Sequence, residues 1–388
     1  MARTEAKTIV AYPYELECAR RICSPSVPEV QGGSRTPLII PLYCRFPRWA
    51  AVKSLLVAIL GLGNPRLQRM PQWLYATLIL AAAIVFTVLP AQSQSPIDYH
   101  QHLLSPSAAK PGSSSKPFTA RDLISLLNAA GIRRALVLSL AYTYGNPNKP
   151  PVANEYAKVR QENNWTADQV AEYPDRLRAF CGVDPLKSYA ISEIERCAKN
   201  RYLHYGLKLH FGNSDVDLDN PSHVADLRRV FGAADKHGMA IVVHMRSSVT
   251  RKRPYGAKEA KIFLNQVLAS APHVPIQIAH LAGAGGFDDP SVDSALSVFI
   301  DAIARQDARM ANVYFDICGV AGIGQWKEKK ALIAQRIRQI GTSRILWGSD
   351  GAFGGGMTPA EALQAYRELP LTTNEFHTID ANVAPYMR

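Results

Sequence analysis

From Ser95 onward the chain repeats one pattern, in which a short run of β-branched or apolar residues is followed by a longer amphipathic stretch. Such alternation is typical of βα units, where helices connect the parallel strands of one sheet. The apolar runs number eight. The predicted strands are residues 97–102, 135–140, 177–183, 206–211, 240–246, 275–281, 313–318 and 344–349.

The stretches between these runs carry helix signals. Thr119 is a good N-cap for a helix that ends at Gly131. Eight strands in about 290 residues predict an α/β fold of the (β/α)8 TIM-barrel type, which typically takes about 250 residues plus insertions. An open doubly wound sheet would ordinarily carry a glycine-rich phosphate turn after its first strand, and residues 103–112 are no such turn. The other predicted helices are 188–200, 221–238, 257–270 and 328–341.

The part before the barrel divides into an irregular leader, 1–69, and an apolar segment, 70–95. Residues 73–91 are uncharged, long enough to cross a bilayer and also typical of a secretory signal peptide. Cleavage near Ala91 is favoured over a retained membrane anchor, because the first strand begins so soon afterwards. In either case the barrel domain, 96–388, is expected outside the cytoplasm, periplasmic or secreted. Signal peptides normally begin within a few residues of their apolar run and Met70 lies just before this one, so a translation start at or near Met70 is the alternative.

The net charge of +12 does not predict nucleic-acid binding, because residues 1–69 alone carry ten Lys and Arg against four Asp and Glu. Of the six cysteines, none forms a CxxC pair. Cys181, Cys197 and Cys318 are interpreted as small apolar core residues. A Cys181–Cys197 disulfide is the alternative in an oxidising compartment.

Polar residues gather where the predicted strands end. His100 and His102 end the first strand and share one face, because they are two residues apart. His244 and His280 lie near the ends of strands five and six, and Asp350 follows strand eight. Active sites of TIM barrels collect at the C-terminal ends of the strands, so these side chains are expected to meet. The histidines that fall on helices or loops receive no role: His204, His223, His237, His273 and His377.

Imidazole nitrogens and a carboxylate suit one divalent ion, Zn²⁺ in the first instance and Mn²⁺ as the alternative. The absence of cysteine from the set fits a catalytic site with an open position. Such an ion lowers the pKa of bound water and polarises a carbonyl. A nearby carboxylate can take a proton from the water, and a histidine can serve as acid or base near neutral pH.

In this order, these residues resemble the amidohydrolase superfamily. The closer resemblance is to its amidohydrolase-related branch, which includes aminocarboxymuconate-semialdehyde decarboxylase, several lactonases and aromatic-acid decarboxylases. It covers about residues 96–387 and does not specify the substrate. The matching motifs are IDYHQH, GLKLHF, VVHMR, IAHLAG and LWGSDG at strands one, four, five, six and eight, and the closing NEFHTIDANVAPYM.

The resemblance implies roles for the five side chains. His100, His102 and His244 would be metal ligands. Asp350 would hold the metal and orient or deprotonate its water. His280 would act as acid or base beside one ion, or as a ligand where two ions bind.

Strands four and five supply three further candidates, assigned to substrate binding. Lys208 stands where two-metal relatives place a carboxylated lysine, but a lysine that pairs with substrate or with a carboxylate is favoured, so one ion is predicted. The register leaves open whether Lys208 or His210 points inward. Arg246 shares a face with His244 and could hold a substrate carboxylate in a bidentate fashion, with a structural ion pair as the equal alternative.

Three functions follow. The leading prediction is hydrolysis of a lactone, ester or amide by metal-activated water. Non-oxidative decarboxylation of a small, for instance aromatic, carboxylic acid is the alternative, and export favours hydrolysis slightly. A non-catalytic extracytoplasmic binding barrel is the third, though no ligand is missing. The expected partner is a small carbonyl or carboxylate compound, and a homodimer is left open.

Overall fold

The computed structural model describes residues 96–388 apart from 110–115, 286, 288, 321–328 and 354–355. Eight parallel strands lie side by side in chain order in one sheet. Each lies within a predicted run, so the predicted strand order is confirmed. The strands are β1 Asp98–Gln101, β2 Ala135–Leu138, β3 Leu177–Gly182, β4 Gly206–His210, β5 Ala240–His244, β6 Ile276–Ile278, β7 Val313–Asp316 and β8 Ile345–Leu346.

The sheet curves into a nearly closed barrel. Tyr99 N donates to Trp347 O (2.9 Å) and Asp350 N donates to His100 O (2.8 Å), so the chain just after β8 runs beside β1. Gly348 is needed at this junction, because a Cβ there would lie 2.8 Å from the Cβ of His100. The closure therefore brings the two ends of the strand order, and their polar residues, together.

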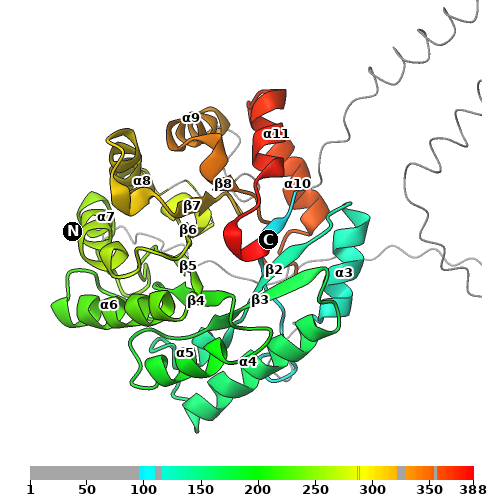
Figure 1. Ribbon diagram of the computed structural model, residues 1–388, viewed down its shortest axis with the longest axis vertical. Coiled ribbons are helices and arrows are strands. Elements are labelled where there is room, and N and C mark those ends of the chain that lie inside the picture. The colour runs from blue at the N-terminus through cyan, green and yellow to red at the C-terminus, as the bar shows by residue number, and fades with distance from the viewer. Residues whose placement is uncertain (1–95, 110–115, 286, 288, 321–328, 354–355) are drawn as a thin grey trace, which may run out of the picture. The chain divides into compact units, whose positions relative to one another are not determined.

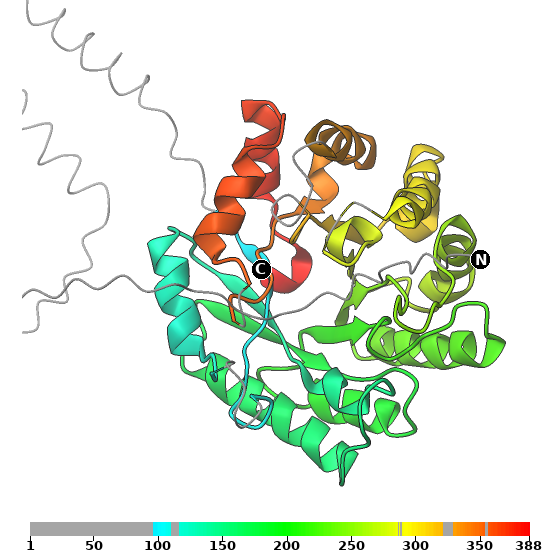
Figure 2. The same cartoon turned by 180° about the vertical axis from the view of Figure 1, so that it is seen from behind.

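Helices surround the strands, as Figures 1 and 2 show. Thr119 caps α3 with a reciprocal capping box to Asp122, and Gly131 takes a left-handed φ of 70° just after the helix, as predicted. The stretch 257–270 is not one α-helix: α7 continues as a π-helical turn, Phe263–Val267, and a 3-10 turn, Leu268–Ser270. The helices are α3 Ala120–Ala129, α4 Glu155–Ala171, α5 Ala190–Ala198, α6 Pro221–Lys236, α7 Ala257–Ile262, α8 Pro290–Ala304, α9 Lys330–Ile340, α10 Pro359–Arg367 and α11 Thr373–Ala381.

Alternate residues of the strands serve two apolar layers. In β2, Ala135 and Val137 belong to the layer between strands and helices, whereas Leu136 and Leu138 face the barrel interior. The interior is completed by the last residues of the chain, Ala384, Tyr386 and Met387. Figure 1 accordingly shows the C-terminus in the middle of the ring of helices. The barrel is thus a filled core, closed from inside by the chain's own end.

The cysteine interpretation needs a correction. Cys181 of β3 and Cys197 of α5 form a disulfide, because the helix packs its Cys197 against the strand, a proximity that sequence spacing does not reveal. Cys318 is a free, buried thiol and keeps the core role expected of it. The predicted leader and apolar segment lie outside the described residues. Within residues 96–388 as described, no helix is long and apolar enough to cross a membrane.

Candidate metal centre

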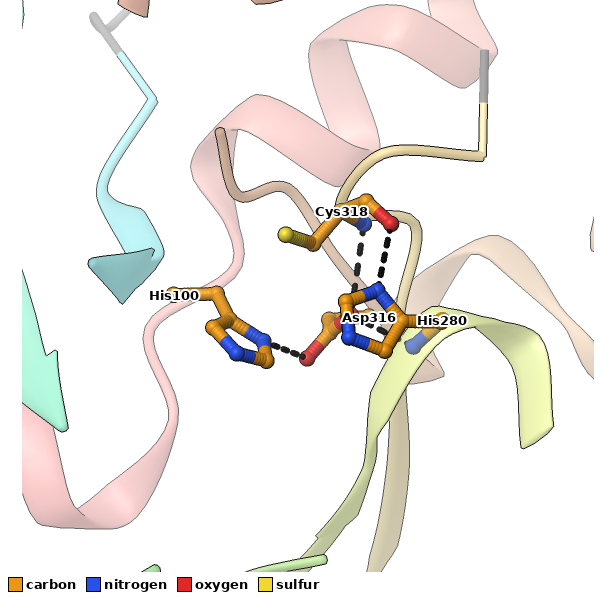
Figure 3. Close-up of side chains that lie close together, drawn as sticks. All are labelled: His100, His280, Asp316 and Cys318. Atoms are coloured by element: carbon orange, nitrogen blue, oxygen red, sulfur yellow. Dashed lines mark hydrogen bonds and ion pairs between the residues drawn. The ribbon is translucent and has the colours of Figure 1, made fainter. Parts of the chain in front are cut away.

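His100 lies in the barrel mouth with both ring nitrogens engaged. Its Nδ1 is 3.0 Å from Oδ2 of Asp316, the last residue of β7. A carboxylate accepts hydrogen bonds, so Nδ1 carries the proton and Nε2 keeps its lone pair. Figure 3 shows the imidazole turned edge-on to this carboxylate. The β7 carboxylate therefore sets the tautomer of His100.

Two more histidines have the same tautomer. Nδ1 of His102 lies 2.7 Å from the Leu138 carbonyl oxygen, and Nδ1 of His280 lies 2.7 Å from the Cys318 carbonyl oxygen. A carbonyl can only accept, so both Nδ1 atoms donate, and in the neutral form of each ring the lone pair is on Nε2. Each Nε2 is therefore available to a metal ion or to a proton.

The backbone after β6 is strained around His280. His280, Leu281 and Ala282 all have positive φ, of 54°, 48° and 68°. The conformation is held by the hydrogen bond from His280 N to Asp316 Oδ1 (2.8 Å). Left-handed non-glycine residues are costly and cluster at functional sites. Asp350, with a φ of 71°, is a further instance at the same end of the barrel.

At this end of the barrel, potential ligand atoms of the described residues form two overlapping groups, each with all atoms within 4.8 Å of one another. One group is His100, His102 and Asp350, with the Asp350 Oδ1 atom 4.0 Å and 3.6 Å from the two Nε2 atoms. The other holds His100, His280, Asp316 and Cys318. Burial raises the pKa of the Cys318 thiol well above its usual value, so Cys318 offers no thiolate.

Charge in the centre suits a cation. Burial lowers the pKa of His100 well below its usual value and that of His102 to about 4, so both are neutral ligands. Burial opposes ionisation of Asp350, but His100, His280, His102 and Lys208 together outweigh it and lower its pKa to about 2. Neutral imidazoles beside an ionised carboxylate are the donors that Zn²⁺ or a similar ion requires. The residues present therefore fit a divalent ion.

His244 lies beside these groups. Its ring centroid is 5.0 Å from that of His280, and it stacks on His210 at 3.8 Å. Among the described residues it belongs to neither group of atoms within 4.8 Å. Burial lowers the pKa of His244 well below its usual value, so it too is a neutral imidazole.

Strand four resolves the register that the sequence left open. The Lys208 side chain points inward, is 1% exposed, and places Nζ 3.0 Å from Nε2 of His100. Burial lowers its pKa to about 8. His210 is only half-buried and accepts a hydrogen bond from Asn213 N at the mouth. An ion bound by His100 would require the Lys208 ammonium to withdraw from Nε2.

Arg246 forms a structural ion pair, the alternative to substrate binding that the sequence left open. Its Nε lies 2.9 Å from Oδ2 of Asp289, its Nη1 donates to Ser247 O, and its guanidinium lies over the ring of Tyr255. These contacts occupy the guanidinium, and a role in substrate binding stays a prediction.

Asp316 and Gln277 did not emerge as candidates from the sequence. For Asp316, the available signal was a carboxylate in the apolar run VYFDIC, at the same position in its run as His100 in IDYHQH.

Asp98 accepts hydrogen bonds from His100 N and from Ser349 N and Oγ, so it joins β1 to the chain after β8. Burial raises its pKa to about 6.

Similarity to known proteins covers most of the barrel. Residues 97–379 match a family described as amidohydrolase. The fold is similar to 5-carboxyvanillate decarboxylase from Sphingomonas paucimobilis, at 16% identity over 74% of this chain and 97% of that one, with a TM-score of 0.52. The enzyme of the same name from Novosphingobium aromaticivorans, complexed with manganese, is 14% identical over 76% of this chain and 95% of that one, with a TM-score of 0.51. The fold is also similar to 2,6-dihydroxybenzoate decarboxylase from Rhizobium, which is 16% identical over 74% of this chain and 96% of that one, with a TM-score of 0.50. No curated protein sequence matches the chain.

Proposed function

The chain belongs to the amidohydrolase family, and we propose that it is a metal-dependent hydrolase of a small lactone, ester or amide. His100, His102, His244 and Asp350 would hold one divalent ion, Zn²⁺ in the first instance and Mn²⁺ as the alternative. When bound, this ion would lower the pKa of a water molecule and polarise the substrate carbonyl. His244 now stacks on His210 and lies outside the groups within 4.8 Å, so its ring would have to move towards them to complete the set.

The tautomer of His280 is the observation that carries the choice of hydrolysis. Its Nδ1 proton is committed to the Cys318 carbonyl oxygen, so Nε2 faces the centre as a base. Hydrolysis begins by removing a proton from water, which a neutral Nε2 can accept. The ring of His280 lies 4.8 Å from that of His100, between centroids, so the base stands next to the ligands.

Lys208 would bind the polar end of the substrate. It is a buried cation inside the ring of histidines, and a carbonyl or carboxylate oxygen would give its ammonium a partner in place of His100. This favours substrates with an acidic group close to the scissile bond.

The same cation supports decarboxylation as a second candidate. A carboxylate held by Lys208 beside the ligand group would be placed for loss of CO2, and His280, once protonated, would return the proton to carbon. The two reactions differ in what they release: hydrolysis yields a new acid without CO2, and decarboxylation yields CO2 and consumes one proton. A binding barrel without activity is the third candidate.

The test uses the purified full chain. Elemental analysis should find about one zinc or manganese per chain, strongly reduced in His100→Ala and retained in the control His273→Ala, whose ring is 82% exposed. Lactones, esters and aromatic acids are then assayed for acid release and for CO2. A wild type that stays metal-free when supplied with Zn²⁺ and Mn²⁺ contradicts the proposal. An ion-loaded protein that binds these compounds without turnover would support the binding barrel instead.

We further propose that the domain works outside the cytoplasm. The Cys181–Cys197 disulfide supports this location, because disulfides persist mainly in oxidising compartments. Cell fractionation with thiol labelling is the test: the protein should be found outside the cytoplasm with both cysteines protected. Recovery in the cytosol with both thiols reactive contradicts the proposal.

A further inference from the structure

Three of the polar side chains buried inside the barrel are linked to one another. Gln277 of β6 and Asp316 of β7 are 0% exposed, and Tyr386 of the C-terminal segment is 7% exposed. Their neighbours in the interior are apolar or aromatic, among them Phe180 and Val242. Buried polar groups are costly unless they are hydrogen-bonded, so their partners indicate why they are there.

The three form one chain of hydrogen bonds that ends at His100. The Tyr386 hydroxyl bonds to Oε1 of Gln277, and Nε2 of Gln277 bonds to Oδ2 of Asp316. The same oxygen accepts from Nδ1 of His100. The direction follows from the last link: a carboxylate only accepts, so the Gln277 amide nitrogen faces Asp316 and its oxygen faces Tyr386. The tyrosine hydroxyl is therefore the donor.

Asp316 fixes the orientation of the amide, and the Tyr386 hydroxyl supports it by donating to the amide oxygen. If the Gln277 side chain turned over, Oε1 would meet the Asp316 carboxylate and the Tyr386 hydroxyl would face an amide N–H. Burial raises the pKa of Tyr386 well above its usual value, so its hydroxyl keeps the proton that it donates. Gln277 Nε2 also reaches the carbonyl oxygen of Tyr99 (3.3 Å), which joins the amide to β1 next to His100.

The segment that carries Tyr386 is itself held by other contacts. The Tyr99 hydroxyl donates to Asn382 O (3.0 Å) and accepts from Ala384 N (2.9 Å). Arg178 donates to the carbonyl oxygen of Tyr386. The C-terminal segment therefore has anchors that are independent of Gln277, which makes the Tyr386 hydroxyl separable by mutation.

We propose that Tyr386 is a positioning residue: through Gln277 and Asp316, it holds His100 in the tautomer whose Nε2 can bind a metal. The C-terminal segment is then part of the candidate metal centre as well as of the core. The inference rests on the proposed function for its consequence in metal binding, while the state of the His100 ring can be measured without metal.

The test is NMR of the metal-free full chain labelled with ¹⁵N-histidine. The His100 signals are assigned by their loss in His100→Gln. Wild type should show a slowly exchanging proton on Nδ1 of His100. In Tyr386→Phe, this proton should exchange faster or share population with the Nε2-protonated form. Zn²⁺ affinity, measured against a competing chelator, should fall about three- to tenfold, less than the ~10–100-fold expected for a direct partner of a ligand.

Tyr99→Phe is the matched control, because it removes a hydroxyl that anchors the same segment but is not itself a link in the chain of hydrogen bonds. It should lower the melting temperature but keep the His100 signal and the Zn²⁺ affinity. Gln277→Met serves as a second variant should Tyr386→Phe not fold, and should perturb His100 in the same way. An unchanged His100 signal in both Tyr386→Phe and Gln277→Met would overturn the inference. Equal effects of Tyr386→Phe and Tyr99→Phe on the His100 signal would overturn it as well. A perturbed signal in a protein that binds no metal would refute the proposed function and leave the positioning role standing.

Discussion

Replacing Asp316 by asparagine tests how the candidate metal centre is held together. The two oxygens of Asp316 accept from four donors: His100 Nδ1 and Gln277 Nε2 on one, His280 N and Cys318 N on the other. An amide of the same shape has only one accepting oxygen. Whichever way it turns, its nitrogen meets two donors.

The backbone donors cannot move, so we expect the amide oxygen to stay with His280 N and Cys318 N. The amide nitrogen then faces His100, whose neutral ring can accept a hydrogen bond only by moving its proton from Nδ1 to Nε2. In that tautomer, Nε2 carries the proton and has no lone pair to offer a metal. Loss of such a partner typically weakens metal binding ~10–100-fold, or about 1.4–2.8 kcal/mol at 1.4 kcal/mol per factor of ten. The free energy of unfolding of the metal-free protein should fall by about 1–3 kcal/mol, the usual cost of one unsatisfied buried group.

The assay is Zn²⁺ competition on the full chain, with urea unfolding of the metal-free protein beside it. Asp289→Asn is the control: it makes the same substitution near the mouth, where asparagine can still cap α8. Affinity within twofold of wild type in Asp316→Asn would refute the reasoning, because His100 would then need no carboxylate to hold its tautomer. An equal loss in Asp289→Asn would point to a general effect of charge.

Three further changes have distinct expected outcomes. His280→Gln should lower kcat about 10²–10⁴-fold while elemental analysis still finds the ion, and loss of the ion would make His280 a ligand. Lys208→Met should tighten Zn²⁺ binding, because it removes a buried cation 3.0 Å from His100 Nε2. It should also raise KM for substrates with a carboxylate. Weaker Zn²⁺ binding in this variant would contradict the prediction. Cys181→Ser should lower the free energy of unfolding by about 3 kcal/mol relative to oxidised wild type, as expected for a loop of roughly 15 residues. It should differ little from wild type kept reduced throughout, which also lacks the disulfide; urea unfolding of the three samples decides.

The order of the strands and the location of the site were predictable from the sequence. Short β-branched or apolar runs that alternate with longer amphipathic stretches indicate βα units, and each predicted run contains a strand. Parallel strands align their C-terminal ends, so the polar residues at those ends were expected to meet. His100, His102 and Asp350 do so, His280 joins His100 in a second group, and His244 lies in neither group. These inferences depend on local pattern and on one topological rule, which is why they could be made without coordinates.

The partners of those residues were decided by the tertiary structure. Asp316 lies 216 residues from His100, and Tyr386 lies 109 residues from Gln277. Neither pair leaves a periodic trace, because the contact depends on the angle of closure between β7, β8 and β1 and on a chain end folded into the barrel. The same holds for the inward turn of Lys208, which depends on the register of β4. Local sequence pattern encodes which face a residue occupies, whereas the contacts across the barrel that set tautomers and orient side chains arise only when distant strands are brought together.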